Sequence, residues 1–135
     1  MNLADTHRKF ESERLRELRD NLQAGLMAAV PDAIISGHSK RRLPGHLHIS
    51  FPYLDAERLV FALEARGVLV ATGSACAANK GMRSHVLTAL GLDPIVADGS
   101  LRLSLGHLST AENSQRAAGI IIEEVLRERQ RIARP

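Results

Sequence analysis

The chemistry that this sequence can offer centres on its single cysteine, Cys76. Cys76 lies in the segment GSACAANKG (73–81), whose glycines and small polar residues are typical of an exposed loop. Lys80, Arg83 and His85 follow closely, and positive charge stabilises the thiolate, which is the reactive form of cysteine. The pattern indicates nucleophilic or sulfur chemistry at Cys76. The alternative is a small buried packing residue, as free cysteines often are.

Arg102 is the second candidate for a functional role. It stands between Leu101 and Leu103 in an alternating segment, on the polar face of an expected strand. An arginine in that position suits a carboxylate or a phosphate, whose oxygens match the planar guanidinium. The alternative is a solvated side chain or a structural ion pair.

Other polar clusters favour simpler interpretations. His46 and His48 share a face of an expected strand, as two metal ligands can, but no third ligand is evident and we expect no metal site. The run 40–42 (Lys-Arg-Arg) is a solvated loop or a docking patch for an acidic partner. The pair Glu123-Glu124, among arginines, is interpreted as solvating charge.

Composition narrows the class of protein. With 135 residues and 44% hydrophobic residues, the chain is expected to form one domain, 1–135, with a modest core. One cysteine excludes an internal disulfide, which fits a reducing compartment. No signal core or membrane-length apolar run is evident, so we expect a cytoplasmic protein without a membrane partner. The net charge of +3 and the absence of tryptophan make a nucleic-acid partner the weakest hypothesis.

Hydrophobic periodicity and turn residues predict the elements that must position these side chains. In chain order we expect helix 6–30, strands 33–36 and 47–51, helix 55–66, strand 68–71, the cysteine loop, helix 84–90, strand 100–105 and a last helix after Ser109. Strands joined by both short and long connections suggest an α/β (α+β) fold, a small mixed sheet of about four strands covered by helices on one side.

Local signals mark the helix ends. Asp55 is expected to cap the second helix, with Leu54 packing on Leu59, and Gly67 to end it in a left-handed conformation. Ser109 and Glu112 have the spacing of a capping box for the last helix. Segment 68–71 is almost wholly apolar, which is typical of a buried strand.

Four segments together resemble cysteine desulfurases, which belong to the pyridoxal-phosphate-dependent class V aminotransferase superfamily. RLPGHLHISF (42–51) resembles the family's RLPNTLNVSF-type segment, TGSAC (72–76) its active-site loop, SHVLTALGL (84–92) the segment that follows, and GSLRLSLG (99–106) its SSIRFSLGR strand. The order and approximate spacing are those of the family, over roughly the whole chain.

The resemblance implies a fold and a set of roles. The fold would be the small, C-terminal domain of fold-type I pyridoxal-phosphate enzymes. Cys76 would attack the sulfur of a cofactor-bound cysteine and carry it as a persulfide. Arg102 would hold the substrate's α-carboxylate, and the loop residues Thr72, Gly73, Ser74 and Ala75 would shape the site.

The departures from the family matter as much. The domain with the Schiff-base lysine is not matched, and none of Lys9, Lys40 and Lys80 lies in the family's lysine motif. Pyridoxal phosphate is therefore expected only in a composite with a separate large domain, and no cofactor in this chain alone. Met82-Arg83 replaces the usual Glu-Pro, and His107 stands where the family commonly has arginine.

Two hypotheses remain open on the sequence. The chain is either the sulfur-carrying part of a desulfurase, or a non-catalytic truncated module that docks on a partner. The expected partners are a pyridoxal-phosphate domain or full-length desulfurase and a sulfur-acceptor protein. We also expect a homo-oligomer, because an apolar surface that packs against the large domain in the family would otherwise be exposed.

Overall fold

Three long helices and a small sheet form the part of the chain that the computed structural model describes, residues 3–36, 43–73 and 94–133. The helices are α1 (Leu3–Ala29), α2 (Ala56–Ala65) and α5 (Ala111–Ala133), and a short α4 (Pro94–Ala97) precedes the last strand. The strands are β1 (Ile34–Ile35), β2 (His46–Ser50), β3 (Ala71–Thr72) and β4 (Ser100–Ser104). The predicted α/β class is confirmed, while the helix expected at 84–90 lies outside the described residues.

The four strands form one sheet in the order β1-β2-β4-β3. All three pairings are antiparallel, where the sequence had suggested a mixed sheet. The central pairing sets His46 opposite Ser104, Leu47 opposite Leu103 and Ile49 opposite Leu101. Because directly opposite residues of an antiparallel pair project to the same side, this register separates an apolar face from a polar one.

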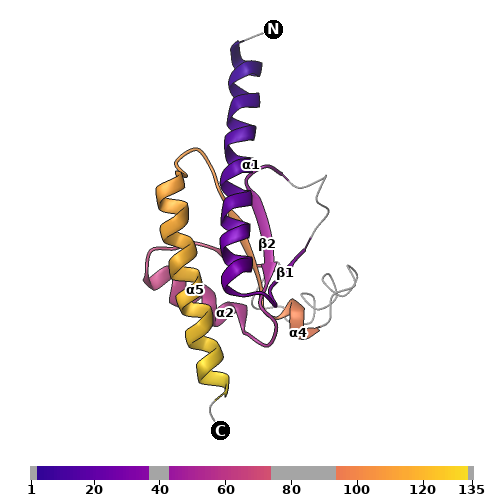
Figure 1. Cartoon of the computed structure of the whole chain (residues 1–135), viewed down its shortest axis with the longest axis vertical. Helices are drawn as coiled ribbons and strands as arrows, with labels where there is room; N and C mark the ends of the chain where they lie inside the picture. The colour runs from indigo at the N-terminus through magenta and orange to yellow at the C-terminus, as the bar shows by residue number, and fades with distance from the viewer. Residues whose placement is uncertain (1–2, 37–42, 74–93, 134–135) are drawn as a thin grey trace.

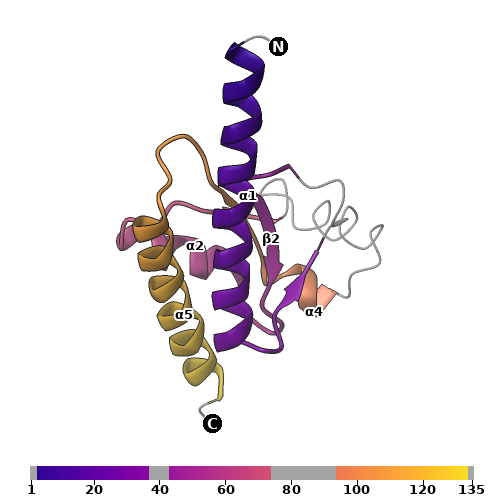
Figure 2. The same ribbon diagram turned by 45° about the horizontal axis from the view of Figure 1, so that its top comes forward.

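The three long helices cover one face of the sheet (Figures 1 and 2). α1 and α5 lie side by side and run in the same direction, with α2 packed behind α5 (Figure 1). The start of α1 projects beyond the other elements, and residues 3–10 are exposed (Figure 1). The three long helices therefore do not cover the opposite face of the sheet, to which the polar side chains of β2 and β4 project.

The core lies between the apolar face of the sheet and the helices. It joins Leu26 of α1, Leu59 and Leu63 of α2, and Val125 of α5 to the strand residues Leu47, Ile49, Leu101 and Leu103. Burying each of these side chains stabilises the fold by roughly 1.5–3 kcal/mol. The two central strands are consequently held in a fixed register, and so are the polar residues that alternate with the leucines.

The ends of α2 follow the sequence signals. Asp55 adopts an extended conformation, and its carboxylate accepts a hydrogen bond from the Glu57 amide at 2.9 Å. Leu54 and Leu59 are both buried in the core, in agreement with the expected staple. Gly67 has φ of +84°, a left-handed conformation that glycine adopts readily, and it ends the helix as predicted.

The prediction for the start of α5 was displaced by one residue. Thr110, and not Ser109, accepts a hydrogen bond from the Asn113 amide at 3.1 Å, and Asn113 accepts one from the Thr110 amide at 2.7 Å. Asparagine thus takes the place that the expected pair assigned to Glu112. The Ser109 hydroxyl is used differently, accepting a hydrogen bond from the Gly106 amide at 2.9 Å.

The buried strand predicted at 68–71 was wrong. Only Ala71 and Thr72 pair with the sheet, and Leu69 is 79% exposed. The Val68 amide donates to the Leu63 carbonyl at 2.9 Å, so the chain is still closing the end of α2 where the strand was expected to begin. The apolar run here lines a surface groove, and Val68 and Val70 pack partly buried against the core.

Candidate functional site

The polar face of the sheet is the face that the long helices leave uncovered. On its central strands it carries the side chains that alternate with the buried leucines: His46, His48, Ser50, Ser100, Arg102 and Ser104. Ala71 and Gly73 extend the same face at β3, because Ala71 pairs with Arg102. The alternation visible in the sequence thus places a histidine, an arginine and the start of the cysteine loop on one surface.

Two serines anchor one end of this face. Ser50 and Ser100 are fully buried, and their hydroxyl oxygens are 2.6 Å apart. The Ser100 hydroxyl also donates to the Val96 carbonyl of α4 at 3.2 Å. This chain of hydrogen bonds satisfies both hydroxyls and fixes the end of the sheet beside Gly73.

His48 and Arg102 face each other across the β2–β4 pairing. Arg102 is exposed, and among the described residues no carboxylate pairs with it. Burial lowers the pKa of the His48 imidazole, and the positive charge of Arg102 lowers it further. The pair therefore presents one permanent cation beside a neutral ring, an arrangement that can take up an anion such as a carboxylate.

Gly73, the residue after β3, packs against the His48 side of this pair. Its amide donates to the Ser100 carbonyl at 2.8 Å, which continues the β3–β4 pairing by one residue. A Cβ atom at Gly73 would lie 2.6 Å from the Ser100 Cβ and would also collide with His48 Nε2. The backbone can approach the imidazole this closely only because residue 73 has no side chain.

The structure brings two of the predicted site residues, Gly73 and Arg102, to the polar face. Gly73 continues the β3–β4 pairing beside Ser100, on the strand that carries Arg102. Thr72 is opposite Leu101 and therefore projects to the other face of the sheet, toward the helices. The other predicted site residues, Ser74, Ala75, Cys76, Lys80, Arg83 and His85, lie outside the described residues. The basic run 40–42 lies outside them as well.

The two histidines on β2 differ in their surroundings. His46 is exposed near the end of the strand, while His48 is partly buried against Gly73. In the described part of the chain, no three His, Cys, Asp or Glu side chains gather as a metal site would require. Within the same ranges, no helix is both long and apolar enough to cross a bilayer.

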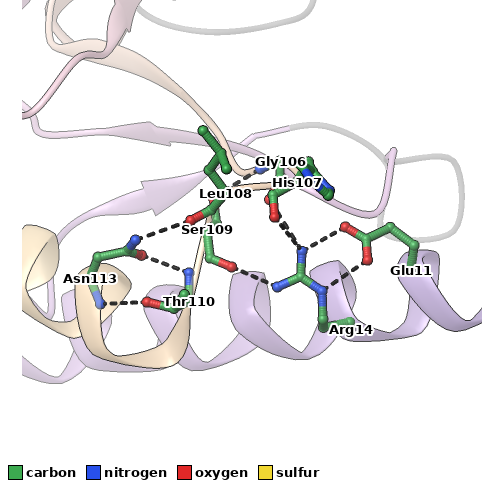
Figure 3. Close-up of polar contacts among 8 residues, drawn as sticks. All are labelled: Glu11, Arg14, Gly106, His107, Leu108, Ser109, Thr110 and Asn113. Carbon is green, nitrogen blue, oxygen red and sulfur yellow. Dashed lines mark hydrogen bonds and ion pairs between the residues drawn. The ribbon is translucent and has the colours of Figure 1, made fainter.

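A polar clasp fixes the loop that follows β4 (Figure 3). Arg14 of α1 donates to the Ser109 carbonyl at 2.6 Å and to the carbonyls of Gly106 and His107 at 3.3 Å each. Glu11 accepts two hydrogen bonds from the same guanidinium at 2.6 and 2.9 Å, and this hydrogen bonding is the main reason that the pKa of Glu11 is lowered. The clasp joins the loop after the strand of Arg102 to α1, and the local sequence could not show it because Arg14 and its carbonyl partners are 92 to 95 residues apart.

Glu124 also departs from its expected role. It was interpreted as a solvating charge, but it is only 3% exposed and pairs with Arg66 at 3.1 Å and Arg127 at 2.9 Å. The contact with Arg66 joins the end of α2 to α5, while Arg127 lies on α5 itself. Glutamate at this position is structural because the packing of the two helices buries it, which the local sequence could not show.

A groove of about 1010 Å³ lies at the end of β4, where Ser104 lines it. It runs between α5 and the segments 66–70 and 103–109, and Leu69 and Leu108 at its margins are 79% and 83% exposed. Its exposed lining is mainly apolar, although Arg66, His107, Asn113 and Arg116 also line it, and it includes none of His48, Gly73 and Arg102. We therefore assign the candidate site to the polar face and not to this groove.

Comparison with known proteins extends these observations. The sequence model of the family Aminotransferase class-V matches residues 3–116. The chain is 40% identical over 116 residues to cysteine desulfurase IscS of Methanosarcina thermophila, covering 85% of this chain and 28% of that protein. It is 41% identical over 119 residues to an IscS-like cysteine desulfurase of Mycobacterium tuberculosis, covering 87% of this chain and 30% of that protein.

Solved structures agree with the sequence relatives. A NifS-like protein superposes with a TM-score of 0.70 at 30% identity, over 85% of this chain and 28% of that one. A NifS-like protein from Rickettsia africae superposes with a TM-score of 0.69 at 27% identity, over 86% of this chain and 29% of that one. This chain spans less than a third of the length of these relatives. With the family match over most of its length, the chain belongs to the aminotransferase class-V family.

Proposed function

We propose that this protein is a sulfur-transfer domain in which Cys76 accepts sulfur as a persulfide and passes it on, while Arg102 orients a substrate carboxylate. Relatives named as cysteine desulfurases support the reaction class. The observation that carries the proposal is the position of Arg102. It is exposed, lacks a carboxylate partner among the described residues, and lies one strand from Gly73, three residues before Cys76 in the sequence.

The loading step can be written for this chain's own thiol. The Cys76 thiolate attacks the outer sulfur of a donor persulfide, a new S–S bond forms, and the donor's S–S bond breaks as its thiolate leaves. Delivery is the same exchange with an acceptor thiolate attacking the outer sulfur of the Cys76 persulfide. The sulfane sulfur keeps its oxidation state throughout, so neither step needs an oxidant or a reductant.

The cofactor belongs to a separate component in this proposal. Pyridoxal phosphate supplies an electron sink for breaking the C–S bond of an amino acid, and it is held by a desolvated lysine. Lys9, the lysine that the described ranges contain, lies on the exposed part of α1 and does not fit that role. We therefore derive no step through the cofactor, and propose a composite with a pyridoxal-phosphate domain or a full-length desulfurase.

The surface supports a proposal of partners. Leu69 and Leu108 are exposed at the same apolar groove and are not scattered singly over the surface. Continuous apolar surface of this kind marks interaction sites. We propose that the chain self-associates or binds the larger domain through this surface and delivers sulfur to an acceptor protein. A reduced thiol is needed for this chemistry, so we propose a cytoplasmic location.

Intact-mass spectrometry tests the loading step. The protein is incubated with a small-molecule persulfide donor beside a Cys76→Ser variant, which has no thiol. We expect the wild type alone to gain the mass of one sulfur atom, in a form that a mild reductant removes. A wild type that stays unmodified under conditions that load a model thiol would overturn the proposal.

A further inference from the structure

The His48 side chain crosses the middle of the sheet. In the strand order β2-β4-β3, His48 belongs to β2 and Gly73 follows β3, with β4 between them. His48 Nε2 nevertheless lies within contact distance of the point where a Gly73 Cβ would be. The imidazole must therefore lean over β4, beside Ser100, to reach the far strand.

The end of this ring is buried in an unusual way. His48 Nε2 is inaccessible to solvent and has no hydrogen-bond partner among the described residues. A buried polar atom without a partner costs about 1–3 kcal/mol, so a position of this kind calls for an explanation. The Gly73 backbone lies next to this nitrogen, since a Cβ atom on Gly73 would collide with it, so the buried nitrogen and the placement of that residue are linked.

The charges around the ring keep it neutral. Arg102 faces it from β4, and His46 lies two residues earlier on the same face of β2. The described residues of β3 add no charge, and the polar face carries no acidic side chain within the described strands. Both burial and Arg102 therefore oppose protonation, and a protonated ring would lie between the Arg102 cation and the backbone of Gly73.

We propose that His48 is a positioning residue for the sulfur-transfer site: its imidazole is the surface against which Gly73 closes, and it thereby sets where the chain leaves β3 toward Cys76. This inference rests on the proposed function for its purpose, but its geometry stands on described residues alone. Protonation of the ring weakens the contact and shifts Gly73.

Two variants on one strand provide a matched comparison. His48→Gln keeps a polar side chain of similar reach but cannot titrate in this range, and His46→Gln removes the exposed histidine on the same face. In an NMR pH titration, the Gly73 amide resonance of the wild type is expected to shift with the midpoint of the His48 ring. His46→Gln should keep that shift and His48→Gln should lose it. A Gly73 amide that does not follow His48 overturns the inference.

A double-mutant cycle tests the contact itself. Gly73→Ala is expected to lower the melting temperature of the wild type, and to lower it less in a His48→Ala background. Some loss should persist in that background because the Ser100 Cβ also occupies the space. Equal losses in both backgrounds would show that the ring does not limit residue 73.

The pH profile of Cys76 alkylation connects the contact to function. Beyond the inflection of the thiol itself, the wild-type profile is expected to show a second inflection at the His48 midpoint, which His48→Gln loses. Persistence of that inflection in His48→Gln contradicts the positioning role. If Cys76 takes up no sulfur while Gly73 still follows His48, the proposed function fails and the contact stands.

Discussion

His48 and Arg102 occupy directly opposite positions on β2 and β4, on the face of the sheet that the three long helices leave uncovered. The buried aliphatic residues on either side, Leu47 and Ile49 on β2 and Leu101 and Leu103 on β4, hold this register. The relationship places a neutral ring and a permanent cation beside the start of the segment that carries Cys76. In the proposed function, this surface binds the substrate carboxylate through Arg102 at the place where the segment that carries Cys76 begins.

The charge of Arg102 is expected to be visible at His48. Replacing it in Arg102→Gln removes the nearby cation, so the pKa of the His48 imidazole should rise. It should remain below the ordinary value of 6.5, because burial is the larger cause of the shift. Side-chain NMR titration measures this pKa, with Arg116→Gln on α5 as a control that should leave it unchanged. An unaltered pKa in Arg102→Gln would show that the two side chains do not interact.

Stability is expected to fall with acidification because of the same histidine. The folded-state pKa of His48 lies below its unfolded value, so the unfolded chain binds more protons in the window beneath about 6.5. The free energy of unfolding is therefore unaffected by His48 above that window and decreases as the pH falls through it. Urea unfolding of the wild type and His48→Gln at several pH values measures the effect. The difference between their slopes should be confined to this window, and parallel pH dependences would contradict the assignment.

The start of α5 provides a test of the corrected cap. Thr110→Ala removes the acceptor of the Asn113 amide and should lower the free energy of unfolding by about 0.5–2 kcal/mol. Glu112→Ala, at the position that the sequence pattern had favoured, should change it by less than about 0.5 kcal/mol, since its pairing with Arg116 is exposed. Chemical unfolding of both variants measures the difference. A larger loss in Glu112→Ala than in Thr110→Ala would restore the original capping prediction.

The clasp around Arg14 is expected to control the mobility of the loop after β4. Arg14→Gln removes the donors that hold the carbonyls of Gly106, His107 and Ser109. Amide hydrogen exchange should accelerate at Ser109, whose amide donates to the Gly106 carbonyl at 2.9 Å, and stay unchanged at core residues such as Leu101. Arg16→Gln, also on α1, serves as the control. Uniform acceleration across the chain would mean that Arg14 acts on global stability instead.

Local signals predicted the elements with strong periodicity. The leucine spacing of α1, the alternation in β2 and β4 and the Asp55 and Gly67 ends of α2 all depend on residues close in sequence. The polar face followed from the same alternation, so Arg102 could be identified before the fold was known. Short-range patterns are reliable here because the helices and strands each bury one continuous apolar face.

Long-range packing produced what the sequence could not show. The apolar run at 68–71 had the composition of a buried strand, yet the closure of α2 at Gly67 and Val68 leaves Leu69 exposed. Glu124 is buried only because α2 and α5 meet there, and His48 differs from His46 only because Gly73 arrives from a strand that is not its neighbour. Each of these depends on contacts between distant segments.

The central claim is that Cys76 both accepts and delivers sulfur, and a single-turnover transfer tests it most directly. The protein is loaded from a labelled persulfide donor, freed of the donor, and mixed with an acceptor thiol while intact masses are followed. The account predicts that the persulfide form of the wild type disappears as labelled sulfur appears on the acceptor, and that Cys76→Ser neither loads nor transfers. A chain that never forms the persulfide, or one that holds the sulfur without releasing it to the acceptor, would contradict the account.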